Sequence, residues 1–284
     1  MQASRPAGSA GSIRPGQLFS SWLGSGGSKG GQSAEEESVG IDLGTTNCAI
    51  AAVVDGKPTI LPAADGQRVW SSVVSFLETA GSDSATAADG DASSRAPLLE
   101  PDSPTARVFV GDSARKQQVT NPYSTYASTK RLIGRTATAE ELKQLCALDV
   151  PHSVSANTRE VLLACPALRR AISPVSVAAE LVRELVSQAE QQLDRNVTSA
   201  VVTVPAYFDD SQRCATETAC LLAGLKRVRL LREPEAAALT YALDAKREER
   251  VMVFDLGGGA ALRGHRTCIS IGHRNLHHYN GTRW

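Results

Sequence analysis

The sequence predicts an α/β fold, and three observations carry that prediction. From residue 199 onward, β-branched runs alternate with segments of helical spacing, as in a sheet with helices packed on its faces. Earlier in the chain, successive apolar runs joined by tight polar turns predict an antiparallel meander. Two apolar runs also end in the same tripeptide, Asp-Leu-Gly, at Asp42 and Asp255.

Composition narrows the class of protein. The 284 residues are 42% hydrophobic and 21% charged, with a formal net charge of zero. This suits a soluble globular protein of one large or two ordinary domains, and it favours neither nucleic acid nor a membrane surface as a partner. No run of about 18 apolar residues exists, so no membrane-spanning helix is expected. The six scattered cysteines have neither zinc-site nor redox-motif spacing, so free thiols in a reducing compartment are expected.

The first 38 residues are low in complexity and rich in Gly and Ser. Residues 1–34 contain no Asp or Glu but carry Arg5, Arg14 and Lys29. Such a segment is typical of an organelle transit peptide and equally of a disordered tail, and both interpretations stay open.

Short strands are expected to dominate the next part of the chain. Gly44-Thr45-Thr46-Asn47 separates the first two, Asp55-Gly56 is a hairpin signal, and the polar residues 78–107 form a loop insertion. The strands expected here are residues 39–43, 48–54, 59–61, 73–76 and 108–110.

Three helices are expected before residue 199. Asp112 is expected to cap a helix through residue 119, and a second helical stretch is expected over 123–133. Ser173-Pro174 is a capping Ser with Pro at the first helical position. The apolar residues that follow it recur at helical spacing, which predicts a long amphipathic helix packed on a sheet: Val177, Leu181, Val182, Leu185, Ala189 and Leu193.

The last part alternates strands and helices. The expected strands are 200–204, 228–231 and 251–256, and the expected helices run from an Asp209 or Asp210 cap to Gly224 and from Pro234 to about residue 245.

The turn after the first strand has the parts of a phosphate-binding loop. Gly44 lets backbone N–H groups approach phosphate oxygens, and Thr45 and Thr46 add hydroxyl donors. Asp42 at the strand end can hold Mg²⁺ through water. Asp255, followed by Leu-Gly-Gly-Gly, repeats most of this pattern, so two related lobes facing one nucleotide are expected. Neither loop is a Walker A motif, because no Gly-Lys-Ser/Thr is present.

Four segments resemble motifs of the seventy-kilodalton heat-shock chaperone family, in that family's order. They are residues 41–47 (IDLGTTN), 129–135 (TKRLIGR), 202–213 (VTVPAYFDDSQR) and 232–239 (REPEAAAL). The resemblance covers about residues 39–259 and implies an actin-like ATPase fold, with lobe I nearly complete and lobe II cut early.

The resemblance also implies roles. Lys130 is expected to orient and polarise the attacking water, with Glu233 ordering water nearby and Asp42 and Asp255 holding hydrated Mg²⁺. Pro205 and Arg213 are expected to relay nucleotide state to a substrate-binding part. The residues expected to bind ATP or ADP phosphates are Gly44, Thr45, Thr46, Asn47, Gly257, Gly258 and Gly259. Without the resemblance, the alternative interpretation is that Lys130 is a lysine on the surface of a helix and Glu233 an acidic residue at a helix N-terminus.

The chain departs from the family's pattern after Gly259. The family continues with Thr-Phe-Asp, whereas Ala260-Ala261-Leu262 stands here, and the next strand of the sheet is expected to be missing. Residues 260–284 contain no Asp or Glu and hold four of the five histidines. A shifted reading frame, a retained intron or a mispredicted exon is expected, with a basic or metal-binding tail as the alternative.

Two smaller departures lie in the fourth segment. Arg232 replaces the family's usual Asn, and Glu235 replaces its usual Thr.

The expected organisation is therefore a tail or transit peptide (1–38), lobe I (39–198), the crossover and start of lobe II (199–259) and a tail outside the family (260–284). ATP binding and hydrolysis in a protein-folding cycle are expected, with weak or absent turnover in this chain. The expected partners are unfolded polypeptide, a J-domain co-chaperone and a nucleotide-exchange factor.

The alternatives are a non-catalytic binding module and a small-molecule kinase of the same fold. Residues 208–213 are similar to bacterial-type members, which favours a mitochondrion or plastid over the cytoplasm.

Overall fold

A computed structural model of the chain describes residues 37–63, 66–79, 106–138, 141, 152–154, 159–242, 249–255, 265–271 and 276–279. The chain divides into two units, residues 1–33 and 34–284, and all described residues belong to the second. The predicted tail or transit peptide, except for its last two residues, and nearly all of the predicted insertion 78–107 lie outside the described residues.

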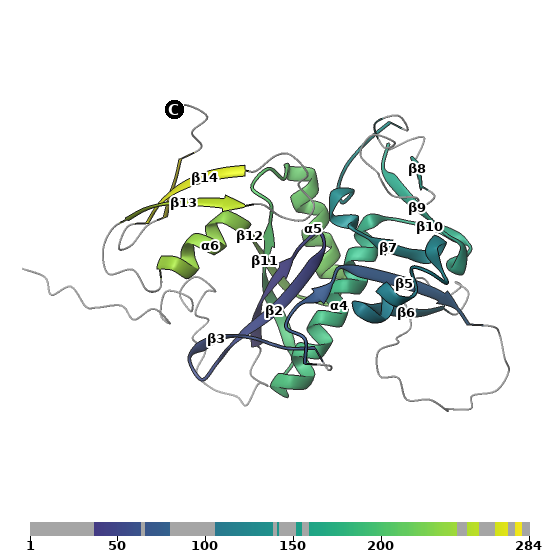
Figure 1. Cartoon of the computed structure of the whole chain (residues 1–284), viewed down its shortest axis with the longest axis horizontal. Helices are drawn as coiled ribbons and strands as arrows, with labels where there is room; N and C mark the ends of the chain where they lie inside the picture. The colour runs from purple at the N-terminus through teal and green to yellow at the C-terminus, as the bar shows by residue number, and fades with distance from the viewer. Residues whose placement is uncertain are drawn as a thin grey trace, which may run out of the picture. The chain divides into compact units, whose positions relative to one another are not determined.

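The largest sheet combines an antiparallel meander with parallel strands (Figure 1). Antiparallel pairing of β1 with β2 and of β2 with β3 confirms the predicted meander. β11 joins β1 in parallel, and β12 joins β11 in parallel. In spatial order the sheet comprises β12 (Arg227–Arg232), β11 (Val197–Val204), β1 (Glu37–Leu43), β2 (Asn47–Val54) and β3 (Lys57–Ile60), with β4 (Trp70–Ser71) also paired to β2.

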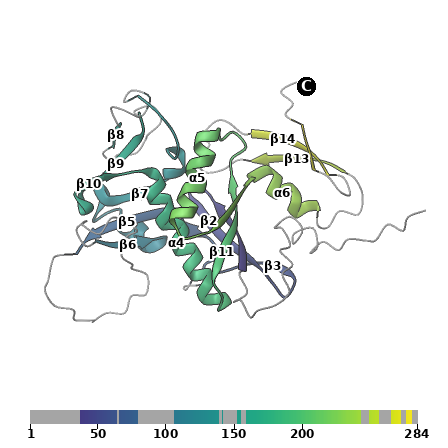
Figure 2. The ribbon, with the colours of Figure 1, turned by 180° about the vertical axis from the view of Figure 1, so that it is seen from behind.

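Two helices, α4 (Pro174–Leu193) and α5 (Asp210–Leu222), pack on each other and on strands of this sheet, as the view from behind shows (Figure 2). Both predicted caps are confirmed. Ser173 Oγ accepts the Ser176 N–H at 3.1 Å, and Asp209 Oδ1 accepts the Gln212 N–H at 2.8 Å. These bonds satisfy N–H groups that have no partner within the first helical turn.

Two smaller sheets lie between the meander and α4 in the sequence. One has the order β6 (Ala106–Val110), β5 (Val73–Glu78), β7 (Thr125–Ala127), and the other has the order β10 (Arg170–Ile172), β9 (Val161–Cys165), β8 (His152–Val154).

The predicted helix over residues 123–133 is wrong. Two 3₁₀ turns, η1 (Pro122–Ser124) and η2 (Thr129–Arg131), flank strand β7 instead. Tyr126 explains the difference: its side chain is buried, and its hydroxyl donates to the Ala164 carbonyl at 2.6 Å. Ser128, in the left-handed region at φ 56°, also interrupts any continuous helix here.

The helix expected after Asp112 forms but is shorter, and Asp112 does not cap it. Helix α2 (Asp112–Lys116) begins at Asp112, and the capping position is Gly111. The Asp112 carboxylate accepts a hydrogen bond from the Ser71 hydroxyl instead, which lowers its pKa.

The expectation that the sheet has no strand after Asp255 is also wrong. β14 (His265–Ile271) pairs antiparallel with all of β13 (Glu249–Asp255), and β15 (Leu276–Tyr279) pairs with β14. Thr and Ile residues in 267–271 favour a strand even though the family's motif is absent. The resulting order, β13-β14-β15, repeats the antiparallel order of β1-β2-β3. Helix α6 (Glu233–Ala242) contacts both β13 and β14 (Figure 1).

Within the described residues, no helix combines the length and the apolar character that a membrane span requires.

Candidate functional site

Of the predicted phosphate loop, Gly44, Thr45 and Thr46 form the turn between β1 and β2, and Asn47 is the first residue of β2. Gly44 lies so close to the following strand that an added Cβ would lie 2.0 Å from the Asn47 carbonyl oxygen. Only glycine fits there, since that contact is with backbone and no side chain can rotate to relieve it.

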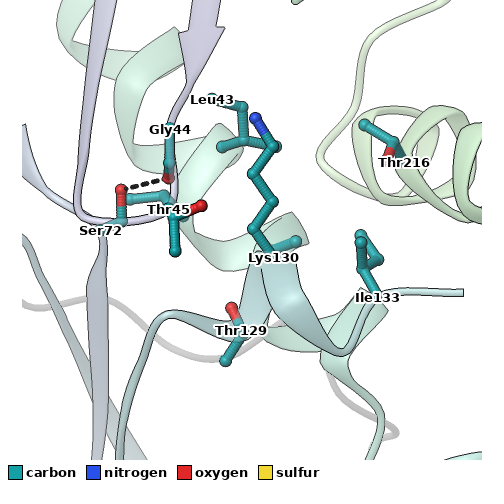
Figure 3. Close-up of a pocket in the computed structure, with 10 residues that line it drawn as sticks. Leu43, Gly44, Thr45, Ser72, Thr129, Lys130, Ile133 and Thr216 are labelled. Atoms are coloured by element: carbon teal, nitrogen blue, oxygen red, sulfur yellow. Dashed lines mark hydrogen bonds between the residues drawn. The ribbon is translucent and has the colours of Figure 1, made fainter. Parts of the chain in front are cut away.

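Ser72, which is not part of this loop, stabilises it through two hydrogen bonds. Its hydroxyl donates to the Gly44 carbonyl at 2.8 Å, and its N–H donates to the Thr46 carbonyl at 2.8 Å (Figure 3). Sequence reasoning missed Ser72, because its only local signal is its place directly before a strand.

Asp42 lies one residue before the end of β1, with an exposed side chain. Parallel pairing places Thr203 of β11 beside it, and the Thr203 hydroxyl donates to Asp42 Oδ1 at 2.7 Å. Mg²⁺ prefers oxygen ligands, and a carboxylate at the end of a strand, held in place by a hydroxyl, offers such oxygens.

The described residues contain no group of three or more His, Cys, Asp or Glu side chains arranged to hold a metal ion.

Lys130 and Glu233 meet although 103 residues separate them. Lys130 Nζ lies 2.6 Å from Glu233 Oε1, with 7% of the Lys130 side chain and 25% of the Glu233 side chain exposed. The interpretation of Lys130 as a surface helix lysine is wrong, because the residue is buried in a 3₁₀ turn. Glu233 is the first residue of α6, so the prediction of a helix N-terminal acid is confirmed.

A small pocket joins the lysine to the phosphate loop. Figure 3 shows the Lys130 side chain extending from its turn toward Leu43 and Gly44. The pocket is lined by Leu43, Gly44, Thr45 and Ser72 on the loop side, by Thr129, Lys130 and Ile133, and by Ala178, Leu181 and Thr216 from α4 and α5.

The charge of Lys130 is balanced by Glu233, and two other groups near the pocket add no negative charge. The Lys130 ammonium lies 5.9 Å from the centroid of the Phe208 ring, which supports the cation without neutralising it. Cys48 directly follows Asn47, and burial raises the pKa of its thiol to about 12. The thiol is therefore neutral at physiological pH and adds no negative charge near the loop.

The two predicted relay residues lie at the turn from β11 to α5. Pro205 is buried, and its carbonyl accepts the Phe208 N–H at 3.1 Å. Arg213 lies in the first turn of α5 and forms an ion pair with Asp210.

The second predicted loop is described only at its start. Asp255 ends β13, but its side chain and the predicted phosphate-binding residues Gly257, Gly258 and Gly259 lie outside the described residues. The structure therefore brings together Lys130, Glu233 and the first loop, and it describes no side-chain contact of the second.

A comparison with protein families identifies the relatives of this chain. The sequence model of the family described as "Hsp70 protein" matches residues 38–91 and 103–262. The chain belongs to the Hsp70 family. The predicted family is therefore confirmed, and so is the α/β fold expected for its actin-like ATPase domain.

Curated Hsp70 relatives agree with this assignment. The chain is 42% identical over 223 residues to the chaperone protein dnaK of Cyanophora paradoxa, covering 78% of this chain and 31% of that protein. It is 42% identical over 226 residues to the chloroplastic heat shock 70 kDa protein 6 of Arabidopsis thaliana, covering 79% of this chain and 27% of that protein. The chain thus spans about a third of the length of the curated Hsp70 proteins that it matches.

Proposed function

We propose that this chain binds ATP or ADP together with Mg²⁺ and hydrolyses ATP slowly, as the nucleotide-binding part of an Hsp70-type chaperone. The observation that carries the proposal is the buried Lys130, paired with Glu233 at 2.6 Å and directed at the Gly44 loop. A buried ammonium beside a glycine turn suits the γ-phosphate of a nucleotide.

The residues of the chain act by positioning. Backbone N–H groups and hydroxyls of Gly44, Thr45 and Thr46 bind phosphate oxygens, and Lys130 orients and polarises the attacking water. Glu233 fixes the Lys130 ammonium and accepts a hydrogen bond from that water. Phosphoryl transfer needs little covalent chemistry from the protein, so such positioning and charge placement are what a site must supply.

Mg²⁺, when bound, neutralises charge on the phosphate oxygens. Asp42 would hold the hydrated ion, with Thr203 keeping one carboxylate oxygen in place at 2.7 Å. Asp255 would be its counterpart on the second loop, where Gly257, Gly258 and Gly259 would bind the nucleotide's phosphates from the other side.

Turnover is proposed to be slow because the second loop lacks a hydroxyl. Ala260 stands where members of the family carry Thr directly after the three glycines. This departure also favours the second candidate function, a non-catalytic module that binds partners without hydrolysing nucleotide.

Calorimetric titration with MgATP and MgADP, followed by single-turnover phosphate release, tests the proposal. Lys130→Met is expected to lower the rate by on the order of 10²-fold or more, because a positioned charge is lost from the transition state. The matched control is Lys116→Met, which removes an exposed lysine from the end of α2 and is expected to change neither binding nor rate.

Each outcome separates the candidates. Saturable binding with slow release that depends on Lys130 supports the proposal. Binding with release that Lys130→Met does not alter contradicts a catalytic role, and no saturable binding contradicts the proposal altogether. Micromolar binding together with rapid release contradicts slow turnover.

Partners and location follow from the relatives and are proposed as such. The matched relatives are named chaperones or heat shock proteins, and three of them, two from Arabidopsis thaliana and one from Pisum sativum, are chloroplastic. We therefore propose unfolded polypeptide, a J-domain co-chaperone and a nucleotide-exchange factor as partners of the whole protein, and an organelle as its location. Of the two organelles that the sequence leaves open, these names favour a plastid over a mitochondrion. Fusion of residues 1–38 to a fluorescent reporter tests the location, and a cytoplasmic signal contradicts it.

A further inference from the structure

Gly134 lies where the segment carrying Lys130 meets the start of α5. Its φ is +64°, and an added Cβ would lie 2.6 Å from both the Ser211 carbonyl oxygen and the Gln212 Cα. The same Cβ would lie 2.9 Å from the Ala215 Cβ. Two of these three contacts are with helix backbone, so no side chain can rotate to make room, and both the space and the backbone conformation require glycine.

Hydrogen bonds fold residues 129–135, which include Lys130 and Gly134, into one compact unit. The N–H groups of Leu132 and Ile133 donate to the Thr129 carbonyl at 2.9 and 3.1 Å. The Arg135 N–H donates to the Leu132 carbonyl at 3.2 Å. Leu132 and Ile133 are buried, so their side chains anchor the unit in the core. A displacement at Gly134 therefore moves the backbone of Lys130 as well.

The first turn of α5, which lies against Gly134, is also held in place by hydrogen bonds. Gln212 closes the capping box of α5, donating its N–H to Asp209 Oδ1 at 2.8 Å and accepting the Asp209 N–H on its side-chain oxygen at 3.4 Å. Phe208, directly before that cap, lies below the Lys130 ammonium and shares a buried apolar cluster with Ile133. Residues 129–135 thus contact the first turn of α5 through Gly134 and the residue before its cap through Lys130 and Ile133.

We propose that Gly134 is a positioning residue for Lys130. Its missing side chain lets the lysine segment lie directly against the first turn of α5, and this contact sets where the ammonium meets Glu233. The catalytic part of this inference rests on the proposed function, but the placement of Lys130 does not.

Gly134→Ala tests the contact, and Gly224→Ala is its matched control. Gly224 lies at the opposite end of α5 with φ +106°, and an added Cβ there has no neighbour within 4 Å. Both variants carry the strain of a side chain at positive φ, but only Gly134→Ala also pushes against the helix.

The first readout needs no nucleotide. A double-mutant cycle of Lys130→Met and Glu233→Gln, measured by urea unfolding, reports the coupling between the two side chains. We expect this coupling to be lost in the Gly134→Ala background and retained in the Gly224→Ala background. Retention in both backgrounds overturns the inference.

The second readout is phosphate release. Gly134→Ala is expected to lower kcat by on the order of tenfold to a hundredfold, since small displacements of a catalytic group have effects of that size. KM is expected to stay unchanged, because the Gly44 loop is not touched. If Gly134 has a purely structural role, Gly134→Ala and Gly224→Ala are expected to lower kcat equally when they are compared under conditions of equal free energy of unfolding.

A second pair of variants serves if Gly134→Ala does not fold. Ala215→Val adds bulk on α5 at the position that faces Gly134. Cys214→Val is its control, because it places the same valine side chain on the neighbouring, exposed position. Loss of the Lys130–Glu233 coupling in Ala215→Val alone supports the inference, and coupling retained in both overturns it. If coupling is lost as expected but the wild-type chain binds no nucleotide, the proposed function fails and the positioning role stands.

Discussion

At the scale of single residues, burial decides what Lys130 and Glu233 do. The ammonium is the more deeply buried partner, with 7% of its side chain exposed against 25% for Glu233. A buried cation without a counter-ion is strongly disfavoured, and Glu233 supplies that counter-ion to Lys130 beside the phosphate loop. Ser72 and Thr203 act in the same neighbourhood, donating hydrogen bonds from their hydroxyls to the Gly44 carbonyl and to Asp42.

Burial also controls the cysteines, which leads to a prediction about labelling. Burial raises the pKa of Cys48 and of Cys220 to about 12, whereas Cys214 is exposed. Because the thiolate is the reactive form, iodoacetamide at pH 8 is expected to label Cys214 in the folded chain and to spare Cys48 and Cys220. Mass spectrometry of peptides from native and urea-unfolded samples measures this. Equal labelling of the three cysteines before unfolding contradicts it.

The same two thiols predict how stability changes in alkali. Their pKa values are raised from 9.0 to about 12 in the folded chain. Their stabilising effect is therefore complete below pH 9 and is lost as the pH rises toward 12, by up to about 1.4 kcal/mol per pH unit for each thiol. Urea unfolding between pH 8 and 11 tests this, with Cys48→Ala and Cys220→Ala expected to flatten the slope. An unchanged slope in both variants excludes these thiols as its cause.

At the scale of elements, the junction of β12 and α6 explains two departures from the family's pattern. Arg232 and Glu235, which replace the usual Asn and Thr, form an ion pair at 3.5 Å across the first turn of α6. Glu235 thereby neutralises a cation that would otherwise lie at a helix N-terminus, where positive charge is unfavourable. The two replacements compensate each other on either side of Glu233.

That compensation predicts a non-additive pair of substitutions. Glu235→Thr alone is expected to lower the free energy of unfolding by about 0.5–1 kcal/mol, since the pair is partly exposed and Arg232 loses its partner. Arg232→Asn/Glu235→Thr is expected to recover most of this loss. Urea unfolding of the two single variants and the double variant measures the coupling. Additive effects contradict the compensation.

At the scale of the whole molecule, two antiparallel meanders each begin with a strand that carries an Asp near its end. β1-β2-β3 and β13-β14-β15 have the same pairing order, and Asp42 and Asp255 lie near the ends of β1 and β13. The first loop has its Thr residues, but the second continues from its glycines into Ala260. The two halves therefore share a backbone pattern but differ in the side chains offered to a nucleotide.

Restoring the missing hydroxyl gives a prediction for the whole site. Ala260→Thr is expected to raise the rate of phosphate release by on the order of tenfold or more, because a donor near the γ-phosphate stabilises the transition state. The affinity for MgADP is expected to stay unchanged, since ADP has no γ-phosphate. Ala261→Thr, one residue further on, is the control, and equal rates for both variants contradict the role of position 260.

Local patterns predicted much of this protein. The meander, the Ser173 and Asp209 caps and the strands β11 and β12 all follow from short stretches of sequence, because hairpin turns, capping bonds and β-branched runs depend on neighbouring residues. The four motifs predicted the family for the same reason, since each can be recognised within a dozen residues.

Contacts between distant segments needed the tertiary structure. Tyr126 forms part of a strand because a carbonyl 38 residues away accepts its hydroxyl, and that contact overrides the helical spacing around it. Lys130 has its counter-ion only in the folded chain, because Glu233 lies 103 residues later in the sequence. The roles of Ser72 and Gly134 could not be predicted from neighbouring residues, since they depend on which backbone lies opposite them. The sequence by itself determined the family and most strands and helices through local patterns, whereas packing between distant segments decided how the candidate site is assembled.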